Sequence, residues 1–236
     1  MTLDELVQQL RAAHGDALRG VVLYGSTVAA DASARGHSVL VVVGGLDVRA
    51  MQAGGAIAQA WEDAGNPAPL TLTEPEWRSS VDVFAIEHAD IAERHRVLYA
   101  AAGFAPVDRA AVQDADVRRQ LEYELLALLL SVRSAIALAG RDAKAQRGIL
   151  SANASRVAAL LRAILRLERR PVPPDAADLC REVATIVGFD AQPFVAALRQ
   201  RRGADVPKAG LEGTLGGFHA GLATLVAWVD ARPASH

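Results

Sequence analysis

Two short apolar runs flank a turn at which a ligand could approach the backbone. The first run, Val21 to Tyr24, ends at Gly25-Ser26, and the second extends from Val39 to Val43. Glycine permits such a turn because it adopts backbone conformations that other residues avoid. Acids at positions i and i+2 of a strand share one face, where they can hold two Mg²⁺ ions for phosphoryl transfer. No Asp or Glu occurs between residues 32 and 46, so the second run lacks that pair.

The arrangement resembles the nucleotidyltransferase superfamily, and in particular its minimal and kanamycin-nucleotidyltransferase-like members. In that family a strand ends in Gly-Ser, a helix follows, and the next strand reads Ser-Asp-Ile-Asp-Leu-Leu-Val-Val. Laid on this chain, that strand falls on residues 36–43 and puts His37 and Val39 at the two acid positions. The resemblance therefore implies a degenerate member that lacks the Asp-x-Asp pair.

A third carboxylate of the family lies on a later strand. Asp82, in the segment SVDVFAIE, matches its place, and Glu87 is the alternative. One acid cannot form a two-metal clamp, so we expect no catalytic residue, no resident metal and no cofactor, with Mg²⁺ bound only if the chain is active. The segment from Asp82 to Tyr99 also resembles one found in a group of bacterial nucleotidyltransferase-like proteins.

The resemblance also bears on the Gly-Ser turn and on the histidines. In the family the turn holds the nucleotide triphosphate, which makes Gly25 and Ser26 candidate nucleotide-binding residues; the alternative is that they only preserve the turn. We interpret His37 as a residue at the strand entry that bonds to the backbone. His88 and His95 are interpreted as structural or surface residues on one face of a helix, because the HExxH spacing of zinc enzymes is absent.

Hydrophobic periodicity predicts a small α/β domain over residues 1–108. Helices are expected at 3–13 and 47–64, and a short helix after Thr73 with Pro75 in its first turn. Strands are expected at 21–24, 39–43, 70–73 and 81–86, and a helix at 87–100. The predicted fold class is α+β, a mixed sheet with helices that precedes an all-α region.

Residues 109–236 show only helical periodicity and predict a bundle of four to five helices. The expected helices span 116–139, 142–168, 175–187, 191–202 and 211–229, separated by glycines and by the prolines at 171, 173 and 174. Many members of the resembled superfamily carry such a helical companion after the catalytic-type domain.

Composition restricts the class of protein further. No run of about 20 apolar residues and no signal peptide is evident, so we expect no membrane span and a cytoplasmic protein. The single cysteine, Cys180, excludes an internal disulfide.

Residues 1–114 hold 8 Lys and Arg against 15 Asp and Glu, a net charge of −7, whereas residues 115–236 hold 17 against 12, a net charge of +5. This asymmetry fits either two complementary units or solvated, arginine-rich helix faces.

Three classes of function remain. The first is a catalytically degenerate nucleotidyltransferase-fold protein that acts as a nucleotide-binding or regulatory module, with a protein partner or a homodimer as its expected associations. The second is an active metal-dependent nucleotidyltransferase that modifies a small molecule, a protein or RNA. The third is an antitoxin-like protein that binds a partner. We expect the chain not to be an enzyme, on the absence of the acid pair at His37 and Val39.

Overall fold

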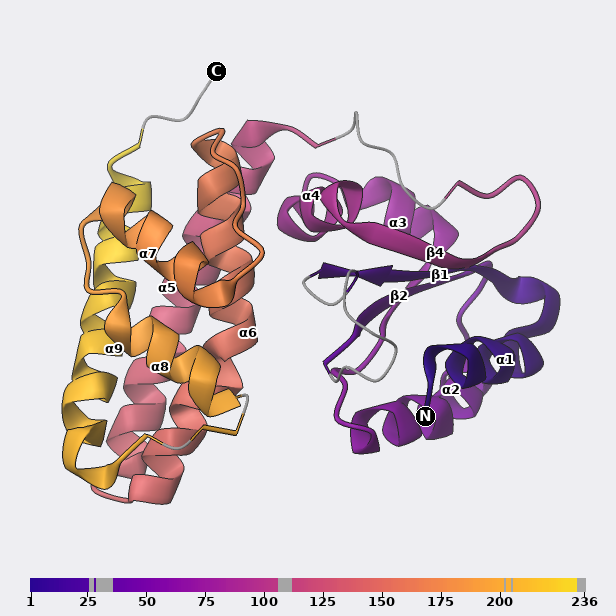
Figure 1. Cartoon of the computed structure of the whole chain (residues 1–236). Coiled ribbons are helices and arrows are strands. Elements are labelled where there is room, and N and C mark those ends of the chain that lie inside the picture. Colours follow the sequence, from indigo (N-terminus) through magenta and orange to yellow (C-terminus); the bar gives the residue numbers. More distant parts are fainter. Residues whose placement is uncertain (26–27, 29–35, 106–111, 202, 205, 233–236) are drawn as a thin grey trace. The chain divides into compact units, whose positions relative to one another are not determined.

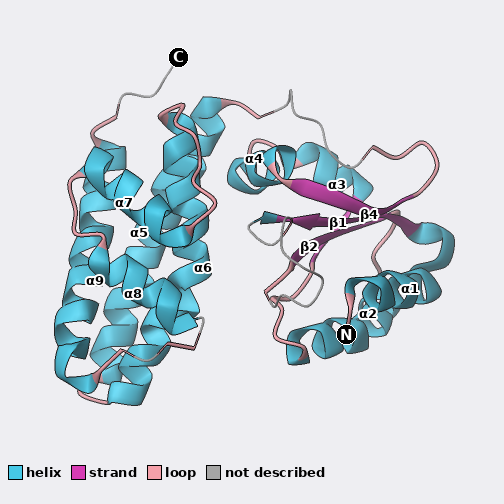
Figure 2. Ribbon diagram, in the orientation of Figure 1, coloured by secondary structure: helices cyan, strands magenta, loops and turns pink. Residues whose placement is uncertain are grey.

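The computed structural model describes the chain except residues 26–27, 29–35, 106–111, 202, 205 and 233–236 (Figures 1 and 2). The chain divides into two compact units, residues 1–112 and 113–236. The first contains a four-stranded sheet with helices, and the described part of the second is entirely helical. This is the α+β class predicted from the sequence.

The sheet of the first unit has the strand order β3-β2-β1-β4. Strand β1 (Leu18–Tyr24) lies at its centre and pairs antiparallel with both β2 (Ser38–Val43) and β4 (His95–Ala100). Strand β3 (Leu70–Thr73) extends the sheet by pairing parallel to β2. The two central strands, β1 and β2, are therefore the two that the sequence marks as continuous apolar runs.

Helices cover both faces of this sheet (Figure 1). Helices α1 (Leu3–His14) and α2 (Val48–Asp63) lie on one face, and α3 (Glu74–Ser79) and α4 (Ala85–Glu93) lie on the other. The pleat divides β2 between the two cores. Val39, Val41 and Val43 pack with α1 and α2, whereas Leu40 and Val42 pack with Trp77 of α3 and Ile91 of α4.

Local signals fix the ends of several of these helices. Thr2 and Thr73 each form a capping box with the Glu three residues later, at the starts of α1 and α3. Asp47 caps α2, and Pro75 occupies the first turn of α3 as predicted. These caps fix the residue at which α1, α2 and α3 each begin.

The segment 81–100 differs from the prediction. The expected strand at 81–86 is a turn over residues 81–84 followed by the start of α4, and the expected helix at 87–100 ends at Glu93. The residues that follow form β4, in which Val97 pairs with Val22 and His95 with Tyr24. The reason is tertiary: β4 is an edge strand whose alternation is weak, and its pairing with β1 overrides the local apolar spacing. His88 and His95 consequently do not share a helix.

Five helices are present in the described residues of the second unit, and all five correspond to predicted helices. They are α5 (Asp114–Ala139), α6 (Ala143–Leu167), α7 (Ala176–Val187), α8 (Gln192–Arg201) and α9 (Lys208–Asp230). Helix α6 contacts each of the other four and supplies many of the buried side chains. It is the one described helix long and apolar enough to cross a membrane by length and composition, but 56% of its most apolar window is buried within the protein, which is typical of a core helix.

Two glycines allow α8 to pack closely on α9. A Cβ atom at Gly221 would lie 2.3 Å from Cε2 of Phe194, and one at Gly217 would lie 2.6 Å from Cγ of Pro193. Phe194 is itself held between Phe189 and Phe218, with ring centroids 4.8 and 5.0 Å away. The aromatic cluster therefore occupies the space that a side chain on this face of α9 would need.

This contact predicts opposite effects for two glycine substitutions in α9. Gly221→Ala should destabilise the protein by about 1–3 kcal/mol, because the enclosed Phe194 ring cannot yield without strain. Gly213→Ala should stabilise it by up to about 1 kcal/mol, because alanine favours helix and no atom outside the helix's own backbone lies within 4 Å of the added Cβ. Urea denaturation followed by far-ultraviolet circular dichroism measures both, and shifts of the same sign would contradict the packing described.

Candidate functional site

The Gly25 turn ends β1 and faces the junction between α4 and β4. Gly25 is buried and has a φ of 81°, a conformation that residues with side chains rarely adopt. Its N–H donates to the carbonyl of Arg94 at 3.3 Å, and its carbonyl accepts from the N–H of Val28 at 3.3 Å. Ser26, the other predicted nucleotide-binding residue, lies outside the described residues. The backbone conformation of Gly25 itself is one that favours glycine.

His37 lies at the entry to β2, as the sequence suggested. Its N–H and that of Gly36 donate to Oδ1 of Asn66, at 3.0 and 3.1 Å. The imidazole is 3% exposed and stacks on the ring of Trp61 of α2, with the centroids 6.3 Å apart. Its surroundings are therefore the core between the sheet and α2; the position at the strand entry is as expected, whereas a hydrogen bond between the imidazole and the backbone stays a prediction.

Val39, at the second predicted acid position, is part of the same core. It pairs with Leu23 of β1 and is 1% exposed. Residues 37, 39, 41 and 43 share this face of β2, so shifting the family alignment by two residues would put Val39 and Val41 at the acid positions instead. The first alignment places a buried imidazole and a buried valine at the acid positions of the resembled family, and the shifted one places two buried valines there.

Asp82 does not occupy the predicted position. It is exposed and lies in the turn before α4, not on a strand of the sheet. Glu87, the alternative, is half-buried in the first turn of α4. The strand that does pair with the far side of β1 is β4, and no acid lies within its bounds.

The sequence reasoning missed the carboxylate that lies beside the Gly25 turn. Asp90 of α4 is 5% exposed, and its Oδ2 would be 4.0 Å from a Cβ placed on Gly25. The two residues are 65 positions apart, and they meet only because α4 turns directly into β4. A buried carboxylate is unusual, but its burial is not visible in the sequence, and its approach to Gly25 depends on β4, whose residues were expected to be helical.

His88 has a structural environment. Its ring stacks on Trp77 with centroids 3.7 Å apart and an interplanar angle of 13°, and its Nε2 lies 3.3 Å from Oγ of Ser80. Burial lowers the pKa of the His88 imidazole to about 4. His88 is therefore neutral at pH 7 and joins α3 to α4. Among the described residues, no group of three or more His, Cys, Asp or Glu could hold a metal ion.

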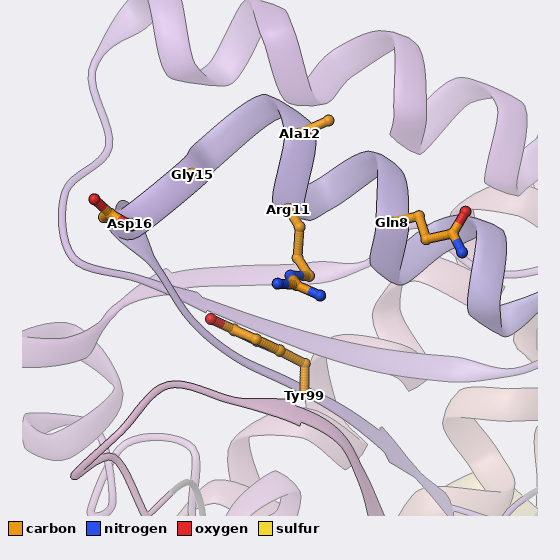
Figure 3. A pocket seen from close by; sticks show the side chains of 6 residues that line it. All are labelled: Gln8, Arg11, Ala12, Gly15, Asp16 and Tyr99. Atoms are coloured by element: carbon orange, nitrogen blue, oxygen red, sulfur yellow. The ribbon is translucent and has the colours of Figure 1, made fainter.

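The described cavities lie elsewhere. A surface cavity of about 390 Å³ is enclosed by the end of α1 and by Tyr99 of β4, and in Figure 3 Arg11 extends over the Tyr99 ring. The guanidinium carbon is 5.3 Å from the ring centroid, a cation–π contact. Tyr99 pairs with Val21 in the middle of β1, whereas Gly25 follows the last residue of that strand. A second cavity, of about 350 Å³, lies between α5 and α9.

Comparison with known proteins supports the fold. No protein-family model matches the chain, and no curated protein matches its sequence. Among solved structures, the chain is similar to spectinomycin adenyltransferase AAD(9) from Enterococcus faecialis, solved with ATP and spectinomycin. The match has a TM-score of 0.59 and 12% sequence identity, and it covers 94% of this chain and 98% of that one. The fold is therefore that of a nucleotidyltransferase, a mixed-sheet α/β unit followed by helices.

The burial of Val39 predicts that a carboxylate restored at this position will destabilise the first unit. Val39→Asp should cost several kcal/mol, because the charge would enter an apolar core with no partner. Val83→Asp is the matched control: Val83 is 60% exposed, and the change should stay within about 0.5 kcal/mol. Thermal denaturation with and without Mg²⁺ is the measurement. A melting temperature near that of the unmodified protein, or one restored by Mg²⁺, would mean that the site is open and binds metal.

The stacked His88 predicts acid sensitivity of the first unit. The pKa of His88 is about 4 in the folded protein and about 6.5 in an unfolded chain, so the unfolded state binds the extra proton first. The stabilisation is complete above pH 6.5 and is lost as the pH falls toward 4, by about 3 kcal/mol at most. Tryptophan fluorescence during urea denaturation, in a Trp228→Phe background, reports on this unit. His88→Phe should keep the stacking and flatten the pH dependence; an unchanged slope would rule out His88 as the source.

Proposed function

We propose that the protein is a nucleotidyltransferase-fold module that does not transfer nucleotides and acts by binding a nucleotide or by regulatory contact. The observation that carries the proposal is the apolar, buried face of β2 at Val39 and Val41, next to the buried imidazole of His37. Nucleotidyl transfer by two metal ions needs oxygen ligands at this face, because Mg²⁺ binds carboxylates in octahedral geometry and a neutral imidazole is a poor substitute. A hydrophobic core between β2 and the helices α1 and α2 supplies none.

The Gly25 turn supports retained ligand binding. A glycine at φ 81° is kept where the backbone must turn sharply, and Asp90 lies beside it. The similar adenyltransferase was solved with ATP, which makes ATP the first nucleotide to test. Gly25 and Ser26 are the proposed contacts for its phosphates, and the protein is proposed to act in the cytoplasm.

An active transferase is the second candidate, and Asp90 is the observation that favours it. A buried carboxylate beside the turn could take part in metal binding if substrate phosphates supplied further ligands. In that case the substrate class would be a small molecule such as the spectinomycin of the similar structure, a protein or RNA. The third candidate, an antitoxin-like protein, would act through a partner and is tested by the identity of the neighbouring genes.

A combined binding and transfer assay separates the first two candidates. Calorimetric titration with ATP, CTP, GTP and UTP, with and without Mg²⁺, should detect binding that Ser26→Asp removes, because a carboxylate repels phosphate. Ser79→Asp, at an exposed position of α3, should leave binding unchanged. Labelled nucleotides with Mg²⁺ or Mn²⁺ should give no transfer to spectinomycin, to RNA or to the protein itself.

The outcomes of that assay are distinct. Metal-dependent labelling that Asp90→Asn or Asp82→Asn abolishes would overturn the proposal in favour of an active transferase and would identify the acid used. Absence of both binding and transfer would eliminate the nucleotide-binding role and leave the regulatory one.

A further inference from the structure

A cavity of about 350 Å³ lies in the groove between α5 and α9, which run antiparallel within the second unit (Figure 1). A volume of this size is enough for a small molecule. The lining residues of each helix follow one another at helical spacings, so each helix contributes one face. Those of α5 are Arg133, Ile136 and its capping residue Gly140, and those of α9 are Glu212, Leu215, Gly216 and His219. With Gln146 of α6, which completes the lining, the cavity is formed within the second unit alone.

The middle of the cavity is apolar and is left open by a glycine. Ile136 is half-buried and Leu215 is buried, and both contribute apolar surface. A Cβ atom added to Gly216 would meet no heavy atom within 4 Å beyond its chain neighbours and the backbone of its own helix. A larger side chain at residue 216 would therefore extend into the cavity without a clash.

Arg133 and His219 make one end of the cavity cationic. Nε of Arg133 donates to Nε2 of His219 at 3.1 Å, so the imidazole is neutral and an acceptor in this contact. This bond uses only the Nε–H group, and among the described residues Arg133 has no ion pair and no further hydrogen bond. The N–H groups of its two terminal nitrogens remain for an anion, and a carboxylate matches the geometry of their fork.

Glu212 and the C-terminus of α5 make the other end anionic. Glu212 lies two helical turns before His219, about 10 Å along the axis of α9. It is exposed, and no described residue forms an ion pair with it. The end of α5 adds the partial negative charge of its carbonyl groups. Nε2 of Gln146 donates to the carbonyl of Gly140 at 2.6 Å, which leaves Oε1 of Gln146 as a further acceptor. A ligand ammonium group fits this end.

We propose that the cavity binds a dipeptide with apolar side chains. Its carboxylate accepts hydrogen bonds from the terminal nitrogens of Arg133, and its ammonium group faces Glu212. Its side chains lie against Ile136 and Leu215. An extended dipeptide spans about 7 Å, and the reach of the two charged side chains covers the rest of the distance between the ends. A free amino acid carries both charges on one carbon and reaches only one end, and a fatty acid has no cation for Glu212.

Calorimetric titration with the dipeptide Leu-Leu tests the ligand class. The unmodified protein should bind one dipeptide per chain. Free leucine, N-acetylated Leu-Leu and C-amidated Leu-Leu should each bind roughly tenfold to a hundredfold more weakly, because each loses a charged contact. Arg133→Gln should weaken the binding of Leu-Leu by a similar factor, but should not weaken that of the amidated dipeptide further, since the carboxylate contact is already absent. Arg199→Gln, which changes an exposed arginine of α8, is the control and should leave binding unchanged.

A pair of glycine variants tests the place of binding. Gly216→Leu should abolish binding, because the leucine side chain fills the cavity. Gly213→Leu adds the same side chain at an open position of α9 outside the cavity and should bind Leu-Leu normally. Far-ultraviolet circular dichroism checks that both variants keep their helices. Absence of binding by the unmodified protein, equal binding of free leucine, or equal effects of the two glycine variants would overturn the proposal.

Discussion

The burial of β2 on both of its faces is the constraint on which the first unit depends. Side chains from Val39 to Val43 alternate between the core under α1 and α2 and the core under α3 and α4, and each is at most 1% exposed. A strand in this position tolerates polar groups only where a partner or solvent meets them. At residue 37 the partners are the Trp61 ring and the amide of Asn66, and at residue 39 there is only hydrocarbon. The polar groups that β2 can place in the two cores are therefore limited to those with a hydrogen-bond or stacking partner.

The conformation of Gly25, at the end of β1, depends on its contacts with α4 and β4. The backbone N–H of Gly25 donates a hydrogen bond to the carbonyl of Arg94, which lies between the end of α4 and the start of β4. Asp90 reaches the turn from the same helix. The geometry of the turn thus depends on two long-range features, the antiparallel pairing of β1 with β4 and the packing of α4 over the sheet.

Much of the fold follows from the sequence, because strong local signals mark the buried elements. The central strands, β3 and all five helices of the second unit were predictable, as were the positions of Gly25, His37 and Val39 within them. The segment 81–100 was not, since α4 is short and β4 is an edge strand with half of its side chains exposed. Asp82 was misplaced for the same reason, and Asp90 was missed because only the tertiary pairing of His95 with Tyr24 brings its helix to the turn.

The short length of β3 has a consequence for solubility. Edge strands present unpaired backbone groups to which strands of other molecules can add. At this edge the strand is only four residues long, and Pro67 and Pro69 precede it, where neither has an N–H to donate. An incoming strand could therefore form few backbone hydrogen bonds before it met proline. On this side of the sheet, the short strand β3 protects the β-branched residues of the interior, which would favour amyloid-like pairing if exposed.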